Sequence, residues 1–466
     1  MYDVVIIGAG IIGSSISREL SKYHLKTIIL EKSYDVSNGT TKANSAIVHA
    51  GYDPIPGTYM AKFNSMGNAM FPKLCKDLSV PFKQIGSLVI AFNNEEIDII
   101  NELFTRGKLN NIPDIKILNS DEILKLEPNI NPEVKKALWC GTAGVVSPYE
   151  LAIALCENAH TNGIEIKLDC EVLDITKAQN YFELKTAQGV IKSKLIINAA
   201  GIFADQINSM ISSKQFKIKP VKGQYLLLNK TTGNLAKHVI FQCPTKLGKG
   251  ILVTPTVYGN TLIGPDAQST HDKNDTSICE ENFENIIKTA LKSFTEIPFK
   301  KAIKTFAGLR AESDSNDFII AESEDVTNFI NVAGIKSPGL SASPAIALYV
   351  SSIVLSKFTG TDKKASFEHR RTSPMLKYNN EEKQKKLLAD NICYSNIICK
   401  CEQISEGEIR DAVNRYPYAT TRDGVKRRVR AGMGPCQGSR CGPKVDAILS
   451  QMKHKQYQEK SEDENN

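Results

Sequence analysis

The first thirty-two residues follow an apolar–polar pattern that predicts a strand, a turn, a helix and a second strand. Residues 2–10 read YDVVIIGAG, a short apolar run that ends in a glycine-rich turn. Apolar positions then recur with helical spacing over residues 11–23, and residues 26–32 form a second apolar run that ends in an acid, KTIILEK. This order is typical of a βαβ unit at the start of a parallel sheet.

The rest of the pattern mixes helical and strand-like segments. Helical spacing appears at residues 60–80, 95–110 and 340–357, and strand-like runs appear at 86–92, 180–201, 222–230 and 250–265. Turn residues at 188–189 and 258–260 predict antiparallel hairpins. We therefore expect an α/β fold in which a Rossmann-like domain is assembled from separated segments of residues 1–360. An antiparallel β-rich domain is inserted at roughly 75–150 and 210–310.

The pattern changes after residue 360. Residues 361–395 are polar and charged, which predicts a linker between two domains. Residues 396–452 place a helical pattern between two pairs of cysteines, which predicts a small helical C-terminal module. The last residues, 453–466, are highly charged and are predicted to form a disordered tail.

Composition and charge narrow the class of protein. The chain is 41% hydrophobic and 23% charged, as in globular proteins, and its net charge of +7 is spread along the length, so nucleic acid is not indicated. We find neither a basic secretory leader nor an apolar run near the roughly 18–20 residues of a transmembrane segment. The eleven cysteines are mostly isolated, which predicts a reducing, cytoplasmic location.

The glycines of the first turn have the spacing of a dinucleotide site, Gly8-x-Gly10-x-x-Gly13. The first permits a tight turn, the second lets the backbone approach a pyrophosphate, and the third lets the helix pack against the strand. Glu31 ends the second strand, where a carboxylate can accept hydrogen bonds from both ribose hydroxyls. An acid at this position disfavours a 2′-phosphate, so FAD or NAD is favoured over NADP.

Five further segments occur in a characteristic order. They are TTKANSAIVHAGYDPIPGTYMAKFNSMGN (40–68), GVVSPYELAIAL (144–155), IINAAGIFAD (196–205), FAGLRAE (306–312) and NVAGIKSPGLSASPAIA (331–347). Together with the glycine turn they resemble the D-amino-acid-oxidase-like FAD-dependent oxidoreductases, in the glycerol-3-phosphate dehydrogenase and 2-hydroxyglutarate oxidase branches. The resemblance covers nearly all of residues 1–360 and implies a Rossmann-like FAD-binding domain with an inserted substrate domain.

The resemblance also implies which residues contact FAD. Ala200 and Gly201 would pass near the adenosine, and the segment from Gly334 to Ser341 would cover the pyrimidine end of the isoalloxazine. The helix that begins at Leu340 could direct its N-terminal amides at that end of the ring. The implied cofactor residues are Gly8, Gly10, Ile12, Gly13, Glu31, Lys32, Thr41, Asn44, Ser45, Val172, Ala200, Gly201, Gly334, Ser337, Gly339, Leu340 and Ser341.

Two residues are candidates for catalysis. Arg310 matches the position at which relatives present an arginine to a substrate carboxylate or phosphate, and its alternative is a structural ion pair. His49 lies where relatives bring the chain past the flavin. It is a candidate base, a flavin contact that some relatives link covalently, or a core histidine. Weaker candidates for the substrate pocket are Lys222, Gln224, Tyr225 and Lys336.

The C-terminal module contains Cys399-x-Cys401 and Cys436-x4-Cys441. Four thiolates in two close pairs suit either a tetrahedral zinc ion or an iron–sulfur cluster. The segments CKCEQISEGEI and DGVKRRVRAGMGPCQGSRCGP resemble the bacterioferritin-associated-ferredoxin-like [2Fe–2S] domain that is appended to some glycerol-3-phosphate dehydrogenase-like flavoproteins. This resemblance implies that the four cysteines bind a [2Fe–2S] cluster.

A basic run lies between the two cysteine pairs and consists of Arg422, Lys426, Arg427, Arg428 and Arg430, with Asp423 opposing it. No aromatic residues are interleaved, so nucleic-acid binding is disfavoured. We expect the run to compensate the charge of the cluster or to dock an acidic electron carrier. The remaining alternative is a solvated helix face.

The predicted function combines a flavin with a one-electron cluster. It is an FAD-dependent dehydrogenase that oxidises a small anionic alcohol, glycerol 3-phosphate or a 2-hydroxy acid such as 2-hydroxyglutarate, and exports electrons through the cluster. The alternatives are an amine or amino-acid dehydrogenase of the same fold, and a non-catalytic electron-transfer subunit. The expected partner is an electron-acceptor protein or a membrane-associated or iron–sulfur partner subunit.

Overall fold

The computed structural model describes residues 1–244 and 250–463 of the chain. Its first sheet has eight strands and holds the N-terminal βαβ unit. β1 (Tyr2–Ile7) runs parallel to β2 (Thr27–Leu30) on one side and to β12 (Gly189–Asn198) on the other. β9 (Glu165–Lys167) and β20 (Phe329–Ala333) extend this parallel core outwards. The antiparallel strands at its margin are β10 (Val172–Lys177), β11 (Phe182–Thr186) and β19 (Ile319–Glu322).

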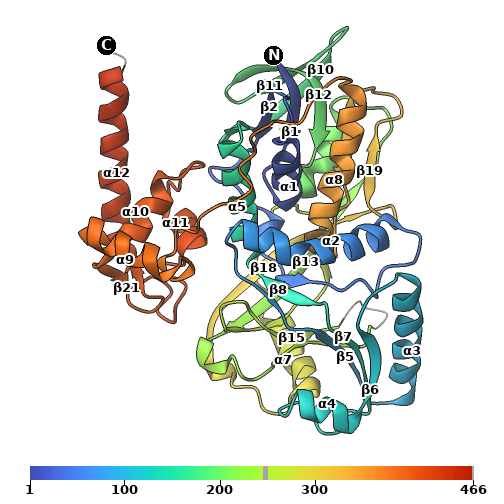
Figure 1. Ribbon diagram of the computed structural model, residues 1–466. Helices are drawn as coiled ribbons and strands as arrows, with labels where there is room; N and C mark the ends of the chain where they lie inside the picture. The colour runs from blue at the N-terminus through green and yellow to red at the C-terminus, as the bar shows by residue number, and fades with distance from the viewer. Residues whose placement is uncertain (245–249, 464–466) are drawn as a thin grey trace.

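Four helices pack beside this sheet, as Figure 1 shows. They are α1 (Ile11–Leu20), α2 (Tyr59–Asp77), α5 (Pro148–Thr161) and α8 (Gly339–Lys357). α1 packs against α5 and α8, and α2 packs against α8. Among the described residues, α8 alone is apolar and long enough to span a membrane by composition, a feature that the sequence analysis did not recognise. Because 61% of its apolar window is buried in the protein, α8 is the core helix of this domain.

The second sheet has nine strands and is formed by residues 87–140 and 218–313. β13 (Ile218–Leu228) and β18 (Ala302–Ser313) form its longest antiparallel pair and reach toward the first sheet. The remaining strands are β5 (Ser87–Ala91), β6 (Ile115–Asn119), β7 (Lys136–Cys140), β14 (Val239–Gln242), β15 (Leu252–Pro255), β16 (Thr261–Gly264) and β17 (Gln268–Ser269). α3 (Asn94–Leu109), α4 (Ser120–Leu126) and α7 (Glu280–Ser293) accompany this sheet.

A third sheet has three strands, with β8 (Gly144–Val146) in its centre and β3 (Ile47–Val48) and β4 (Phe82–Gln84) at its sides. The two larger sheets and the C-terminal module confirm the predicted α/β class.

The segment predicted as a linker is partly packed against the first domain. Lys363 forms a β-bridge with Tyr23, and the Arg371 side chain is buried and donates to Glu157 Oε2 at 2.5 Å. Much of the stretch from 362 to 370 is nevertheless exposed, and so is most of the polar helix α9 (Glu381–Asp390) that follows. The chain from 362 to 375 is therefore a strap along the domain surface rather than a free connection.

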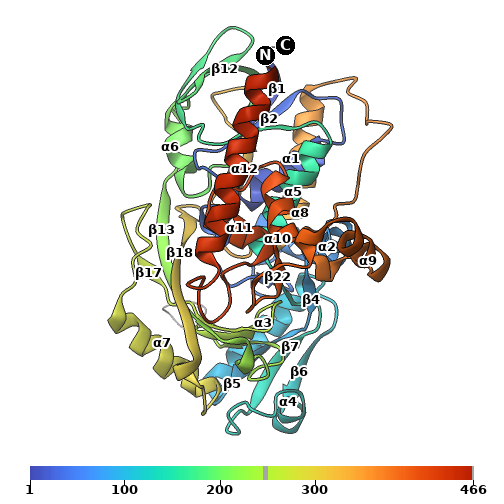
Figure 2. The ribbon, with the colours of Figure 1, turned by 90° about the vertical axis from the view of Figure 1, so that its left-hand side faces the viewer.

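The C-terminal module is a small helical unit with its own apolar core. A short hairpin of β21 (Ile397–Cys399) and β22 (Ile404–Ser405) leads into α10 (Glu406–Asn414), followed by α11 (Arg422–Val429) and α12 (Gly442–Asp463). Ser405 and Glu408 form a capping box that fixes the start of α10. In Figure 2 the module lies in front of the first domain.

α12 continues through Asp463, into the segment for which the sequence predicts a disordered tail. The Gln, Lys and Glu residues of this segment are good helix formers. Residues 464–466 lie outside the described residues.

Candidate functional site

A cavity of about 810 Å³ lies where the two large sheets meet. Its walls come from the carboxyl ends of β1 and β2, residues 38–49, residues 199–203, β18 and residues 335–340. These segments are distant in the sequence, and the fold brings them together at the carboxyl edge of the parallel strands, where α/β folds bind ligands.

The glycine turn at this edge has two functions. Gly8 has φ +103°, and a Cβ added there would lie 2.6 Å from the Ala199 carbonyl oxygen. A Cβ on Gly13 would lie 1.9 Å from the Gly8 carbonyl oxygen, so this glycine allows α1 to approach β1. Gly8, Gly10 and Ile12 line the cavity, whereas Gly13 lies outside it and has a packing function.

Glu31 and Thr41 tie the loops around the cavity to the glycine turn. Glu31 Oε2 accepts a hydrogen bond from the Ala9 amide at 2.8 Å, and Oε1 accepts one from Ser33 N at 2.9 Å. Burial of this carboxylate raises its pKa. Thr41 Oγ1 accepts a bond from Ile11 N, in the first turn of α1, at 3.0 Å. Both side chains therefore line the cavity in fixed positions.

Most of the other predicted cofactor residues also line this cavity. They are Lys32, Asn44, Ser45, Val172, Ala200, Gly201, Ser337, Gly339 and Leu340. Gly334 and Ser341 do not line it. Gly334 adopts φ +65° in the turn before α8, and Ser341 Oγ accepts a hydrogen bond from His49 N at 2.7 Å. These two residues support the segments that form the cavity wall without facing the cavity themselves.

A polar group lies on one side of the cavity and includes Arg310, Tyr225, Ser45 and His49. Tyr225 Oη lies 3.4 Å from Ser45 Oγ, and burial raises the pKa of this tyrosine while the nearby Arg310 opposes the rise. Arg310 donates from Nη2 to the Asp266 carbonyl at 2.9 Å. His49 Nε2 lies 3.3 Å from Ser337 Oγ. The guanidinium of Arg310 and the imidazole of His49 therefore line the same cavity.

The four cysteines of the module approach in two pairs. Cys401 Sγ and Cys436 Sγ lie 3.7 Å apart near the surface, whereas Cys399 and Cys441 are buried. Burial and the neighbouring Cys399 raise the pKa of Cys441 to about 11. In the described residues no three carboxylate, imidazole or thiol groups converge on one metal-ion position. Two thiol pairs fit a two-iron cluster, in which each iron takes two thiolates, better than a single zinc ion.

Residues 3–353 match the family model described as FAD dependent oxidoreductase, and residues 397–451 match the BFD-like [2Fe-2S] binding domain. The chain belongs to the FAD-dependent oxidoreductase family. The predicted cofactors, FAD and a [2Fe–2S] cluster, are thereby confirmed.

One relative of this oxidoreductase covers nearly the whole chain, and others cover about three quarters of it. It is 49% identical over 451 residues to a glycerol 3-phosphate dehydrogenase of Caloramator mitchellensis, covering 97% of this chain and 94% of the relative. It is 37% identical to a glycerol 3-phosphate oxidase of Mycoplasma genitalium, covering 74% of this chain and 92% of that one. A solved structure of L-alpha-glycerophosphate oxidase from Mycoplasma pneumoniae with FAD bound aligns with a TM-score of 0.76 and 31% identity. That alignment covers 79% of this chain and 98% of the other.

Two weaker predictions for the substrate pocket of the oxidoreductase are wrong. Lys222 Nζ pairs with Asp275 at 2.8 Å, and Gln224 is fully buried and accepts from Cys279 N at 2.6 Å; neither lines the cavity. Both lie on β13 with the same parity, whereas Tyr225 points the other way, into the cavity, because side chains alternate along a strand. Lys336 does line the cavity, and its Nζ lies 3.4 Å from Glu312 Oε2.

The sequence analysis missed one part of the cavity wall. Lys273, Asn274 and Thr276, in the connection between β17 and α7, line the cavity beside the predicted residues. Lys273 forms an ion pair with Asp205. This connection carries no periodic or glycine signal, so only the fold shows that it reaches the site.

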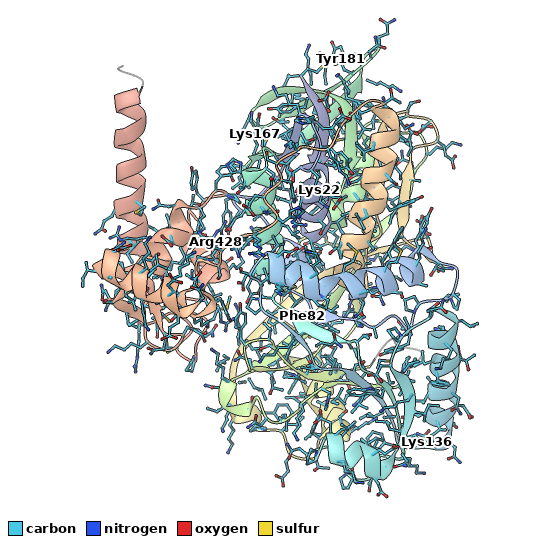
Figure 3. All side chains as sticks on the ribbon, in the orientation of Figure 1. Lys22, Phe82, Lys136, Lys167, Tyr181 and Arg428 are labelled. Atoms are coloured by element: carbon cyan, nitrogen blue, oxygen red, sulfur yellow. The ribbon has the colours of Figure 1, made fainter. Side chains whose placement is uncertain are left out.

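Two interpretations of the basic run, a docking surface and a solvated face, are wrong for three of its arginines, and compensation of the cluster charge stays a prediction. Arg427, Arg428 and Arg430 are 1–4% exposed, so they present neither a docking surface nor a solvated face. Arg427 and Arg428 pair with Asp35 of the flavin domain, and Arg430 pairs with Glu402. Figure 3 shows Arg428 on the side of the module that faces the flavin domain. The sequence could not reveal this pairing, because Asp35 lies 393 residues from Arg428.

The other two cations of the run also have neighbours. Arg422 pairs with Asp446 of α12. Lys426 is partly buried near Lys304, and burial, with that like charge, lowers its pKa to about 8. The run is therefore mostly engaged within the protein.

Proposed function

We propose that this oxidoreductase oxidises glycerol 3-phosphate at its secondary alcohol and exports the electrons through the [2Fe–2S] cluster. The observation that carries the proposal is the 49% identity to a glycerol 3-phosphate dehydrogenase over 97% of this chain, which includes both the flavin domain and the cluster module. The M. genitalium and M. pneumoniae relatives, which cover about three quarters of the chain, support the same substrate for the flavin domain.

In this proposal Arg310 holds the phosphate. The neighbouring strand leaves it room, because a Cβ on Gly223 would lie 2.7 Å from Arg310 Nη2. One of its nitrogens is anchored on the Asp266 carbonyl, which orients the remaining donors of the planar guanidinium. Lys273 and Lys336 also lie in the cavity wall, and each is paired with a carboxylate, Asp205 and Glu312 respectively.

His49 is the proposed base for the hydroxyl proton. Its ring stacks on Phe241 with centroids 5.7 Å apart, its Nε2 lies beside Ser337 Oγ, and its backbone is held by Ser341. A neutral imidazole in this position can accept the proton from the substrate hydroxyl. When bound, FAD supplies the acceptor for the hydride of the carbinol carbon.

The proposed FAD contacts are the cavity-lining members of the predicted set. Gly8, Gly10 and Ile12 would hold the pyrophosphate, and Glu31 would accept hydrogen bonds from the ribose. The amides at the start of α8, next to Ser337 and Gly339, would stabilise negative charge on the flavin.

The acceptor and the location are further parts of the proposal. An external one-electron acceptor protein takes electrons from the cluster, because such a cluster carries one electron at a time. A cytoplasmic location is supported by the eleven cysteines, which form no disulfide in the described residues.

Anaerobic mixing of the purified protein with candidate substrates tests the proposed function. Glycerol 3-phosphate is expected to bleach the oxidised flavin absorbance rapidly, whereas L-2-hydroxyglutarate and amino acids at equal concentration leave it unchanged. Bleaching by L-2-hydroxyglutarate or an amino acid in place of glycerol 3-phosphate would reject the proposed substrate. No bleaching by any of them would favour an electron-transfer subunit.

A further inference from the structure

The flavin domain and the cluster module meet at a buried carboxylate. Asp35 lies in the loop after β2 and is 1% exposed. Arg428 grips both its oxygens, with Nη1 at 2.8 Å from Oδ2 and Nη2 at 2.9 Å from Oδ1. Arg427 Nη2 donates to the same Oδ2 at 2.8 Å. Arg427 also pairs through Nε with Asp423 of its own helix at 3.0 Å, so Arg428 is the cation that relies more on Asp35.

Further hydrogen bonds hold the same contact in register. Arg427 Nη1 donates to the Val36 carbonyl at 2.6 Å, and Arg428 Nη2 donates to the Pro417 carbonyl at 2.6 Å. A Cβ on Gly424 of α11 would lie 3.0 Å from Asp35 Oδ2, so the helix backbone approaches the carboxylate closely. We call these contacts of Asp35 and Val36 with α11 the Asp35 clamp.

On the flavin side, the clamp lies next to the cavity wall without being part of it. Ser37 N donates to the Ala9 carbonyl at 2.9 Å, and Ala9 N donates to Glu31 at 2.8 Å. Lys32, Ser33 and Asn38, which surround Asp35 in the sequence, line the cavity. The loop that forms part of the cofactor site is therefore the loop that α11 grips.

On the cluster side, α11 leads from the clamp to the segments that carry two of the cysteines, and further contacts hold these segments. α11 ends at Arg430, whose Nε donates at 2.9 Å to Glu402, the residue after Cys401. Glu402 also pairs with Lys230, which follows β13 of the nine-stranded sheet, at 2.7 Å. Met433, three residues before Cys436, accepts a hydrogen bond from Tyr149 of α5 at 3.4 Å. The segments that carry Cys401 and Cys436 thus contact the body of the protein.

From this network we infer that Asp35 is a positioning residue for electron transfer between the flavin and the cluster. It holds the module in one place against the cofactor loop, so electrons pass within a single chain without a domain movement. The inference rests on the proposed function. Its physical basis is that the rate of electron transfer falls steeply as the separation of donor and acceptor grows.

The electron count is balanced by an external one-electron acceptor. Substrate oxidation transfers two electrons and one proton to the flavin as hydride and leaves the hydroxyl proton on the base. Two successive one-electron transfers to the cluster, with the acceptor oxidising the cluster after each, return the flavin to its oxidised form. The two protons are released to solvent.

The chain offers a matched control on the same helix. Arg422 of α11 forms an arginine–aspartate pair with Asp446 of α12. Both residues belong to the module, and their side chains are 56% and 48% exposed. Asp446→Asn therefore removes a carboxylate partner of α11 without touching the domain contact. Asp35→Asn removes the buried charge at nearly constant volume, and Asp35→Glu retains the charge as a conservative rescue.

The test compares two rates in the holoenzyme after anaerobic mixing with glycerol 3-phosphate. In Asp35→Asn we expect FAD content, iron content and the rate of flavin bleaching to stay within about twofold of the wild type. Reduction of the cluster should be at least tenfold slower, with partial recovery in Asp35→Glu and no change in Asp446→Asn. Hydrogen–deuterium exchange, which needs no substrate, should show faster exchange of α11 amides in Asp35→Asn only.

Each contrary result has a distinct meaning. Cluster reduction at the wild-type rate in Asp35→Asn would overturn the inference, as would loss of FAD, which would assign Asp35 to cofactor retention. If Asp35→Asn does not fold, an unchanged cluster rate in Asp35→Glu with faster α11 exchange would overturn it as well. If glycerol 3-phosphate fails to bleach wild-type flavin, the proposed function fails. In that case the flavin is reduced by light with EDTA as the electron donor, and the rate of cluster reduction is again compared between the variants.

Discussion

The two cofactor regions of this protein are built in opposite ways. The walls of the flavin cavity come from at least six segments between residues 7 and 340. Much of its shape depends on glycines at which a side chain would collide with neighbouring backbone. The cluster site takes its four thiols from two short segments between residues 399 and 441. A site made of long-range contacts depends on the whole fold, whereas a site made of local ligands depends on a few atoms. The two regions should therefore respond differently to mutation.

The largest effect is expected at the ligands of the cluster. Cys436→Ser should remove the iron–sulfur absorbance and most of the iron, because Cys436 supplies one of only four thiolates. FAD content and flavin bleaching should be retained, since the flavin domain has its own core. Iron analysis and the visible spectrum measure this, with Cys279→Ser, outside the module, as the control. Loss of FAD together with iron would show that the two regions are not separable.

A backbone change should be nearly as severe in the flavin region. Gly13→Ala places a Cβ 1.9 Å from the Gly8 carbonyl oxygen, so α1 must move away from β1. We expect at least a tenfold loss of retained FAD with the iron content intact. Gly189→Ala, at the start of β12, is the control, because Gly189 lies outside the cavity and a Cβ there meets no atom within 4 Å. Equal FAD retention in the two variants would contradict the packing function of Gly13.

Arg310 should show an intermediate effect that is confined to the substrate. Arg310→Met removes a charge-assisted contact and should lower kcat/KM for glycerol 3-phosphate by roughly 10²–10³-fold. FAD and iron should be unchanged, and exposed Arg370 serves as a control through Arg370→Met. Steady-state kinetics measure the change. A decrease of less than about threefold would assign Arg310 to structure.

The smallest effect is expected where the domains meet, at Glu150 of α5. Burial raises the pKa of Glu150 to about 7, Tyr258 donates to one of its oxygens, and Oε1 has no partner within the described structure. The pKa of Glu150 in the folded protein lies above the usual value of roughly 4.3. The contribution of Glu150 to the free energy of unfolding is therefore at its full value below a pH of roughly 4.3. The contribution is lost as the pH rises through about 7.

Glu150→Gln should therefore gain stability relative to the wild type as the pH rises from 5 to 8. We expect the difference in Tm to grow by a few °C, as measured by thermal unfolding across that pH range. A constant difference in Tm would show that Glu150 does not change its protonation on folding.

The comparison also explains what the sequence could predict. Gly8, Gly10 and Glu31 have a fixed spacing within one βαβ unit, and the four cysteines lie in two short motifs, so both cofactors follow from local patterns. Lys273 and the partners of Arg427 and Arg428 depend on contacts across hundreds of residues, and no local pattern encodes them. The docking and solvated-face interpretations of the basic run fail for this reason, because the sequence does not show that Asp35 is the buried partner of these arginines.

The strap at residues 362–375 has a consequence for how the two domains are joined. Arg371 fixes the strap to Glu157 of the flavin domain, and Met375, at its far end, is buried in the core of the module. The exposed helix α9 follows this second anchorage, and the Asp35 clamp provides an independent contact. A chain cut within α9 would therefore leave two fragments that remain associated. Folded contacts, rather than peptide continuity, hold the two redox centres of this protein together.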